Sequence, residues 1–274
     1  MKTLLLGATG QIGNAFAEQL PSHWDIISLG KKELDLRNAD NIPSTVFKFE
    51  PELIINCAAF TEVDLAEKKK NECSAINHIA VHELAKTSKA LGARLVHFST
   101  DYVFDGCQAL AYSEQSPTGP LSHYGQTKLD GENSISDTGC EFLIFRTSWV
   151  FAKNGKNFIG KIDKLLRDRD EISVVNDQFG APTSASFIAK IVLLSLLGSN
   201  LSNGIYHLSS AGATSWLGLA QKYLALCLNE SAENRQYKCR KIIGIPSSEY
   251  QTAAARPSNS ILDCAKLFDN IPAT

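Results

Sequence analysis

The feature that most constrains the fold of this chain is a glycine-rich turn close to its start. Residues 7–13 read G-A-T-G-Q-I-G and lie between an apolar run at 3–6 and a helical pattern at about 11–20. Between a strand and a helix, such glycines allow a tight turn and close approach of the backbone to a pyrophosphate, which then meets the free N–H groups of the helix N-terminus. The turn therefore predicts a dinucleotide-binding βαβ unit, and a purely structural turn is the alternative.

The pattern after this turn predicts an α/β protein. Strand-like apolar runs alternate with helical patterns, and they fall at 3–6, 26–29, 53–57, 94–98 and 142–145, with helices at about 11–20, 72–91 and 124–134. Short apolar strands joined by helices indicate right-handed crossovers and a parallel sheet covered on both faces. We therefore expect a Rossmann-type doubly wound parallel sheet.

Beyond residue 150 the alternation loosens. Helical patterns follow at 158–166, 187–197 and 216–228, strand-like ones at 172–175 and 205–208, and little periodicity is left after 246. We expect residues 1–150 to form the dinucleotide-binding domain and 151–274 to form mainly a smaller C-terminal substrate-binding lobe. Part of 184–208 is expected to return to the first domain.

Composition excludes several classes of protein. The net charge of −2 gives no basic excess for nucleic-acid binding, and no apolar run is long enough for a membrane span or a signal-peptide core. The seven cysteines include no C-x-x-C spacing and are odd in number. Reduced thiols in a cytoplasmic protein are the simplest interpretation, and no metal site is predicted.

Two lysines after the second strand bear on the choice of cofactor. Gly30-Lys31-Lys32 stands where an NAD enzyme often has an acidic residue for the ribose 2′-hydroxyl. Lysines would instead attract a 2′-phosphate. This favours NADPH, with NADH as the alternative, although both lysines could simply be solvated.

The candidate catalytic group is a Y-x-x-x-K pair with a threonine. On a helix, Tyr124 and Lys128 would lie on one face. A phenol has an unperturbed pKa of about 10, and a nearby ammonium lowers it, which would make Tyr124 a proton donor for a carbonyl being reduced. Thr100 ends the fourth strand, at the sheet edge where α/β proteins bind ligands, and would donate a hydrogen bond to the substrate oxygen.

Longer motifs identify a family resemblance. The G-x-x-G-x-x-G spacing resembles the extended branch of the short-chain dehydrogenase/reductase superfamily. Five further runs resemble, in the same order, motifs of the dTDP-4-dehydrorhamnose reductases: S-T-D-Y-V-F-D-G at 99–106, Y-G-Q-T-K-L-D-G-E at 124–132, R-T-S-W-V at 146–150, D-Q-F-G-A-P-T at 177–183 and R-P-S-N-S-I-L-D at 256–263. They span nearly the whole chain.

The resemblance implies an oxidoreductase of dTDP-rhamnose and polysaccharide biosynthesis. It would reduce the 4-keto group of dTDP-6-deoxy-L-lyxo-4-hexulose to give dTDP-L-rhamnose, with NADPH as the usual donor. The residues implied as catalytic are Thr100, Tyr124 and Lys128. Those implied to bind cofactor, besides Tyr124 and Lys128, are Gly7, Gly10, Gln11, Ile12, Gly13, Asp35, Leu36, Ala58, Ala59, Phe60 and Thr61. Those implied to meet the sugar are Thr100, Asp101 and Trp149, the last with a core aromatic as its alternative.

Two departures and three rivals accompany the resemblance. The family's T-P-A-x-R-P reads T-A-A-A-R-P at 252–257, and its final amphipathic helix is not expected after 263. A sugar-nucleotide 4,6-dehydratase would carry T-D-E where this chain has T-D-Y at 100–102. A reductase of another nucleotide 4-keto-sugar stays open, as does a non-catalytic NADP-binding regulatory subunit resembling the methionine adenosyltransferase β subunit. A homodimer is expected only because two-fold dimers are the commonest assemblies.

Overall fold

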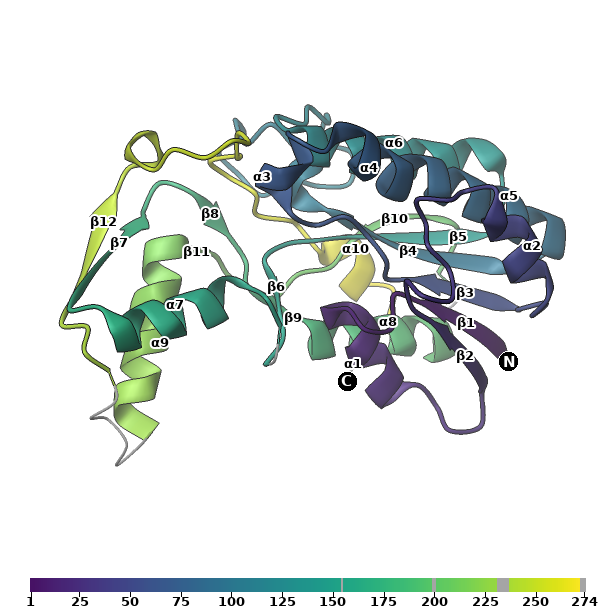
Figure 1. Cartoon of the computed structure of the whole chain (residues 1–274), viewed down its shortest axis with the longest axis horizontal. Helices are drawn as coiled ribbons and strands as arrows, with labels where there is room; N and C mark the ends of the chain where they lie inside the picture. The colour runs from purple at the N-terminus through teal and green to yellow at the C-terminus, as the bar shows by residue number, and fades with distance from the viewer. Residues whose placement is uncertain (154, 199–200, 231–236, 272–274) are drawn as a thin grey trace.

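A six-stranded parallel sheet forms the centre of the molecule (Figure 1). The computed structural model describes residues 1–153, 155–198, 201–230 and 237–271. The strand order is β10-β5-β4-β3-β1-β2, and every neighbouring pair is parallel. The strands are β1 (Lys2–Leu6), β2 (Asp25–Leu29), β3 (Leu53–Asn56), β4 (Arg94–Thr100), β5 (Phe142–Thr147) and β10 (Gly204–His207). The predicted Rossmann-type class is confirmed, and the strand order reverses between β1 and β3, where such sheets bind ligands.

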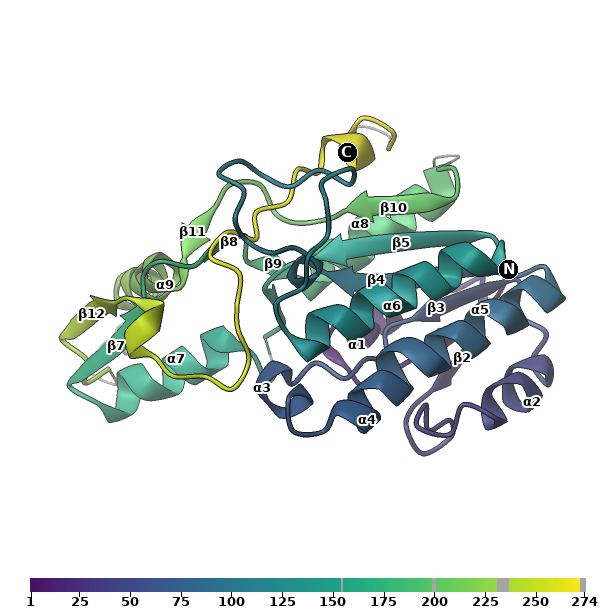
Figure 2. The same ribbon diagram turned by 90° about the horizontal axis from the view of Figure 1, so that it is seen from above.

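Helices cover both faces of this sheet, as Figures 1 and 2 show. On one face lie α2 (Asn41–Phe47), α3 (Val63–Ala66), α4 (Lys70–Ser74), η1 (Ala75–Ile79), α5 (Ala80–Leu91) and α6 (His123–Thr138). On the other lie α1 (Gln11–Gln19) and α8 (Ala185–Gly198). Because neither face meets water, all four residues of β3 are buried, which explains its continuous apolar run.

One long helix of the pattern contains an irregular turn. The helix expected at 72–91 is present as α4, η1 and α5 in direct succession, and η1 has π-helical hydrogen bonding. Such π turns occur frequently at functional sites. This one carries Asn77, whose side chain is buried.

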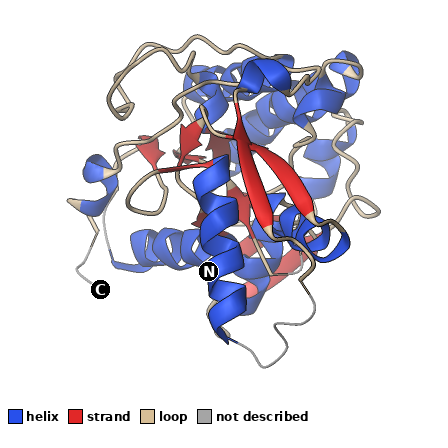
Figure 3. Cartoon of the chain, turned by 90° about the vertical axis from the view of Figure 1, so that its left-hand side faces the viewer, coloured by secondary structure: helices blue, strands red, loops and turns tan. Residues whose placement is uncertain are grey.

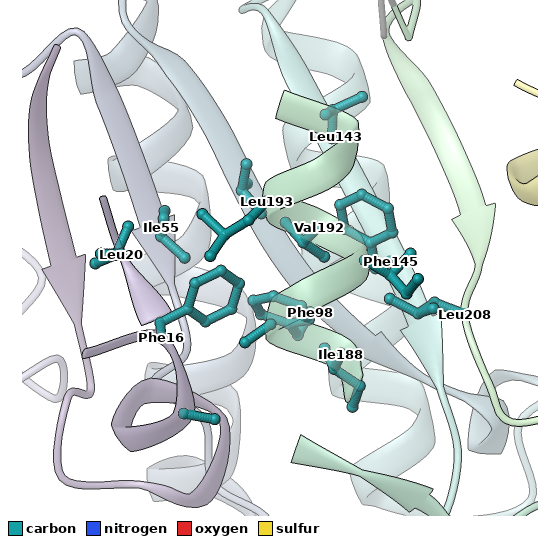
Figure 4. Packing of buried hydrophobic residues seen from close by; sticks show 14 of the residues in the cluster. Phe16, Leu20, Ile55, Phe98, Leu143, Phe145, Ile188, Val192, Leu193 and Leu208 are labelled. Atoms are coloured by element: carbon teal, nitrogen blue, oxygen red, sulfur yellow. The ribbon is translucent and has the colours of Figure 1, made fainter. Parts of the chain in front are cut away.

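An apolar core fixes the first helix against the sheet (Figure 4). Phe16 of α1 packs on Phe98 of β4 with ring centroids 5.7 Å apart, and Phe98 stacks on Phe145 of β5 at 6.1 Å. Ile188 and Val192 of α8 complete this core. Full burial of each such side chain contributes about 1.5–3 kcal/mol to folding. The position of α1, and hence of the glycine turn before it, is therefore set by the core.

A smaller unit stands at one end of the sheet, and Figure 3 looks directly onto it. Its helices are α7 (Phe158–Asp168) and α9 (Trp216–Glu230). Its strands pair as β7 (Glu171–Val175) with β12 (Lys241–Ile245), β8 (Phe179–Gly180) with β11 (Thr214–Ser215), and β6 (Val150–Phe151) with β9 (Thr183–Ser184). Short η4 (Ser247–Glu249) follows β12. Ile162, Leu166 and Ile172 are buried in its own core.

The chain passes between the two units more than once. After β9 it returns as α8, which packs against α1, and as β10, which pairs with β5 at the sheet edge. The last helix, α10 (Ala265–Phe268), contacts β10. Among the described residues, no helix is both long enough and apolar enough to cross a membrane.

Candidate active site

The glycine turn forms a cradle at the carboxyl end of β1. Gly7 has a φ of +72°, which favours glycine, and a Cβ on Gly13 would lie 2.2 Å from the Gly7 oxygen. Helix α1 therefore starts directly against the turn. Its N-cap residue is Gly10, which has no side chain that could accept a hydrogen bond from the first N–H groups of the helix. A cradle without side chains and an uncapped helix N-terminus fit a pyrophosphate.

The side chain of Gln11 connects this turn to the second unit. Its Oε1 accepts hydrogen bonds from the Ala152 N–H at 2.9 Å and from Asn157 Nδ2 at 2.8 Å. Ile12, the next residue, packs against the apolar core. The side chains of Gln11 and Ile12 are therefore engaged with the protein, and only their backbone groups lie at the N-terminus of α1.

The predicted cofactor wall at 58–61 follows β3 and is held from two sides. The Ala58 N–H donates to Asn56 Oδ1 at 3.1 Å. Further along, the Phe60 N–H donates to Asn77 Oδ1 at 2.8 Å, and Asn77 Nδ2 donates to the Phe60 oxygen at 3.0 Å. The π turn η1 therefore fixes this loop, which contains Ala59 and continues into Thr61.

Charges of both signs lie beyond the end of β2. Lys31 and Lys32 are exposed, and the Glu33 carboxylate accepts the Gly30 N–H at 2.9 Å. A hydrogen bond from Arg37 lowers the pKa of Asp35 to about 2, although burial acts in the opposite direction. Leu36 is buried in the core below. Lysines and an arginine at this place fit a phosphate group on the adenosine ribose.

The structure brings Thr100 and Tyr124 within hydrogen-bonding reach of each other at the end of β4. The Thr100 hydroxyl donates to Asp101 Oδ1 at 2.9 Å and accepts the Tyr102 N–H at 3.2 Å. Ser122 caps α6, because its hydroxyl accepts the Gly125 N–H at 3.1 Å. A Cβ on Gly125 would lie 2.2 Å from the Tyr102 oxygen, so only glycine lets α6 approach this closely.

The expected effect of Lys128 on Tyr124 is not found. Lys128 Nζ donates to the Phe98 oxygen at 2.6 Å and lies 3.0 Å from His97 Nε2. Burial raises the pKa of Tyr124 above its usual value, and the hydrogen bond with Thr100 offsets this only in part. The i, i+4 spacing places both residues on one face of α6, but the lysine extends toward β4 and not toward the phenol.

Burial also shifts the other ionisable groups of the site. It lowers the pKa of Lys128 to about 8 and raises that of Asp101 to about 6, even though the Thr100 hydroxyl donates a hydrogen bond that favours the Asp101 carboxylate. Perturbed groups gathered at a sheet edge are typical of functional sites.

Trp149 lies at the junction of the two units. Its φ is +47°, and its ring stacks on Trp216 with centroids 3.3 Å apart and planes 5° apart. A Cβ on Gly180 would lie 2.5 Å from the Trp149 ring, and Trp216 Nε1 donates to Gln178 Oε1 at 3.2 Å. The predicted sugar-contacting tryptophan is therefore held between Gly180 and α9.

Three residues at the site were not singled out from the sequence. His97 is a polar residue inside the apolar strand that leads to Thr100, and this was an available signal. Asn77 looks like any polar residue in a long helix, and Trp216 belongs to no motif. Within the described part of the chain, no group of three or more His, Cys, Asp or Glu residues could hold a metal ion.

Comparisons with known proteins identify the family. The family model described as the RmlD substrate binding domain matches residues 1–272. A dTDP-4-dehydrorhamnose reductase of Burkholderia thailandensis is 39% identical over 96% of this chain and 90% of its own length. One from Escherichia coli K12 is 36% identical over 98% and 92%.

A solved structure gives the same result. The dTDP-4-dehydrorhamnose reductase of Bacillus anthracis str. Ames, solved in complex with NADP, is 34% identical. The structural match covers 99% of this chain and 95% of the Bacillus anthracis chain, with a TM-score of 0.89.

Proposed function

The chain belongs to the dTDP-4-dehydrorhamnose reductase family, and we propose that it uses NADPH to reduce the 4-keto group of dTDP-6-deoxy-L-lyxo-4-hexulose. One observation supports this most directly. Thr100 and Tyr124 meet at the carboxyl end of β4, on the same sheet edge as the glycine cradle after β1. A carbonyl held there would lie beside a proton donor and a cofactor site.

Each residue then has a separate task. The cradle at 7–13 would hold the pyrophosphate, and the loop at 58–61 would line the path of the cofactor. When bound, NADPH supplies the hydride. Thr100 would orient the keto oxygen by hydrogen bonding, and Asp101 and Trp149 would contact the sugar.

The raised pKa of Tyr124 suits an acid. A buried phenol whose pKa is raised stays protonated at neutral pH, and an alkoxide forming at C4 is basic enough to take its proton. Tyr124 would therefore act as the donor without prior ionisation, while Thr100 stabilises the developing negative charge. Lys128 would hold the nicotinamide ribose.

The test follows NADPH absorbance with the purified protein and enzymatically made dTDP-6-deoxy-L-lyxo-4-hexulose. We expect substrate-dependent NADPH loss, reduced by about 10²–10⁴-fold in Tyr124→Phe, as is usual when an acid–base group is removed. Tyr250→Phe, at an exposed tyrosine, is the matched control and should keep full activity.

Absence of turnover would reject this proposal if NADPH still bound tightly. The chain would then be a reductase of another nucleotide 4-keto-sugar or a non-catalytic regulatory subunit. Co-purification of a partner protein would identify the regulatory subunit. A cytoplasmic location and a homodimer stay predictions.

A further inference from the structure

A chain of buried polar groups leads away from Lys128 beneath the sheet edge. His97 and Asn56 are 1% exposed, as is Lys128. His97 Nε2 lies 3.0 Å from Lys128 Nζ, and His97 Nδ1 lies 3.1 Å from Asn56 Nδ2. Asn56 Oδ1 in turn accepts the Ala58 N–H at 3.1 Å. The catalytic helix and the cofactor loop are thus joined through one imidazole.

The backbone at Ala58 determines the direction of every hydrogen bond in this chain. A peptide N–H can only donate, so the oxygen of the Asn56 amide must face it, and the Asn56 NH2 group must face His97. That group is also only a donor. His97 Nδ1 must therefore present a lone pair, and a neutral imidazole then carries its hydrogen on Nε2.

This assignment has a consequence for the lysine. The His97 Nε2–H points at Lys128 Nζ, which can accept it only with the lone pair of a neutral amine. An ammonium at the same place would set N–H against N–H, because it has three donors and no acceptor. A neutral amine keeps its own hydrogens for the Phe98 oxygen, which lies at 2.6 Å.

We propose that His97, held in its Nε2–H form by Asn56, donates a hydrogen bond to the neutral amine of Lys128 and thereby favours that form of the lysine over the ammonium. His97 is then a positioning residue, since it acts through Lys128. The inference rests on the proposed function only for its consequence in catalysis. The donor and acceptor pattern belongs to the ligand-free chain.

The surrounding charges do not remove this effect. Glu132 on α6 and Cys73 on α4 both favour the ammonium, yet burial outweighs them and lowers the pKa of Lys128 to about 8. Tyr124 on the same helix is neutral because burial raises its pKa. Burial holds the pKa of His97 well below its usual range, and the Lys128 charge lowers it further where the lysine is protonated, so an imidazolium is not an alternative partner.

Substitution of Asn56 should reverse the pattern. In Asn56→Asp a carboxylate replaces the amide and can accept both the Ala58 N–H and a His97 Nδ1–H. The imidazole then presents the Nε2 lone pair to Lys128, which favours the ammonium. Asn133→Asp is the matched control, because it introduces the same charge at an exposed position on α6.

The first measurement is the tautomer of His97 in ligand-free, 15N-histidine-labelled protein by long-range proton–nitrogen NMR. His97→Gln assigns the signals by their loss. At pH 9, above the Lys128 pKa of about 8, we expect the neutral Nε2–H form in the wild type and the Nδ1–H form in Asn56→Asp. A wild-type Nδ1–H form, or a charged ring, would overturn the inference, and this holds even if the variant does not fold.

The second measurement is NADPH affinity against pH, followed by fluorescence. Wild-type affinity should fall as the pH rises through about 8, where Lys128 loses its proton. In Asn56→Asp this fall should move up by at least one pH unit, whereas Asn133→Asp should match the wild type. An unmoved fall in Asn56→Asp would contradict the inference. Neither measurement needs the sugar, so failure of turnover alone would reject the proposed function and leave this inference standing.

Discussion

At the scale of single residues, Asp101 combines a buried carboxyl group with a pKa raised to about 6. In the unfolded chain the pKa of Asp101 is about 3.9. Between about pH 4 and 6 the folded chain therefore keeps a proton on Asp101 that the unfolded chain has lost. The free energy of unfolding accordingly falls as the pH rises from about 4 to 6. Above pH 6 the folded chain contains a buried carboxylate. Asp101→Asn should therefore raise the free energy of unfolding by about 2 kcal/mol at pH 7.5.

Urea unfolding at two pH values checks this prediction. The gain should shrink to nearly nothing at pH 4, because the wild-type carboxyl is then protonated in the folded state as well. Reductase activity should fall at the same time, since the proposed sugar contact is altered. An equal gain at both pH values would show that the charge is not its cause.

A second residue-scale prediction concerns the ion pair between Arg146 of β5 and Glu132 of α6. The guanidinium donates to both carboxylate oxygens at 2.6–3.2 Å, and the side chains are 4% and 1% exposed. Glu132→Ala leaves a buried cation without its partner and should lower the free energy of unfolding by about 3–5 kcal/mol. Lys86→Ala, which breaks an exposed pair with Glu83, should change it by less than about 1 kcal/mol. Similar losses in both variants would contradict this reasoning.

The sequence predicted which residues share an element better than it predicted which distant residues they contact. The spacing of Tyr124 and Lys128 correctly indicated a shared helix face, but the direction of the lysine depends on a carbonyl and an imidazole of β4. Those partners are distant in sequence and belong to no motif. The same holds for Trp216, which reaches Trp149 only through the arrangement of α9.

At the scale of elements, α6 approaches its neighbours through glycine. A Cβ on Gly131 would lie 2.4 Å from the backbone oxygen of Asn77 in η1. Because that atom is backbone, the two helices must separate, and overpacking of this kind usually costs about 1–3 kcal/mol. Gly131→Ala should therefore lower stability by about this amount and weaken NADPH binding, since η1 holds the loop that contains Phe60.

Chemical denaturation and NADPH titration measure the two effects. Asn133→Ala, at an exposed position of the same helix, should leave stability within about 0.5 kcal/mol and binding unchanged. If Gly131→Ala were as stable as this control, the close contact of α6 with η1 would not matter.

Elements with a clear apolar pattern were predictable from the sequence, and short or weakly patterned ones were not. The inner strands β3 and β4 are buried on both faces and therefore read as apolar runs. Helix α2 has only seven residues and contains Pro43, and α3 has four. Strand β12 was not predicted, because its residues show no alternation of buried and exposed positions. It is recognisable as a strand only through its pairing with β7, which is distant in the sequence.

At the scale of the whole molecule, an ion pair joins the segment after η4 to the main sheet unit. Arg256 donates to Asp64 of α3 at 2.7 and 3.2 Å, and the Ala254 N–H donates to the same carboxylate at 3.1 Å. Burial alone would raise the pKa of Asp64, but the Arg256 guanidinium outweighs it and the net shift is downward. The ion pair between Asp64 and Arg256 therefore stabilises the folded chain above about pH 4, and this stabilisation is lost as the pH falls below that value.

Asp64→Asn should loosen this connection without altering either core. We expect a loss of about 1 kcal/mol, or about 2–4 °C in Tm, because Asp64 is half exposed. The KM for the sugar nucleotide should rise, while the Kd for NADPH stays constant, since the backbone of the predicted cofactor cradle lies between β1 and α1, which this ion pair does not contact. Lys241→Ala is the control, because its pair with Glu171 lies wholly within the smaller unit and should affect neither constant. A rise in the NADPH Kd with an unchanged sugar KM would show that this ion pair acts on the cofactor site, and not on the placement of the smaller unit over the substrate.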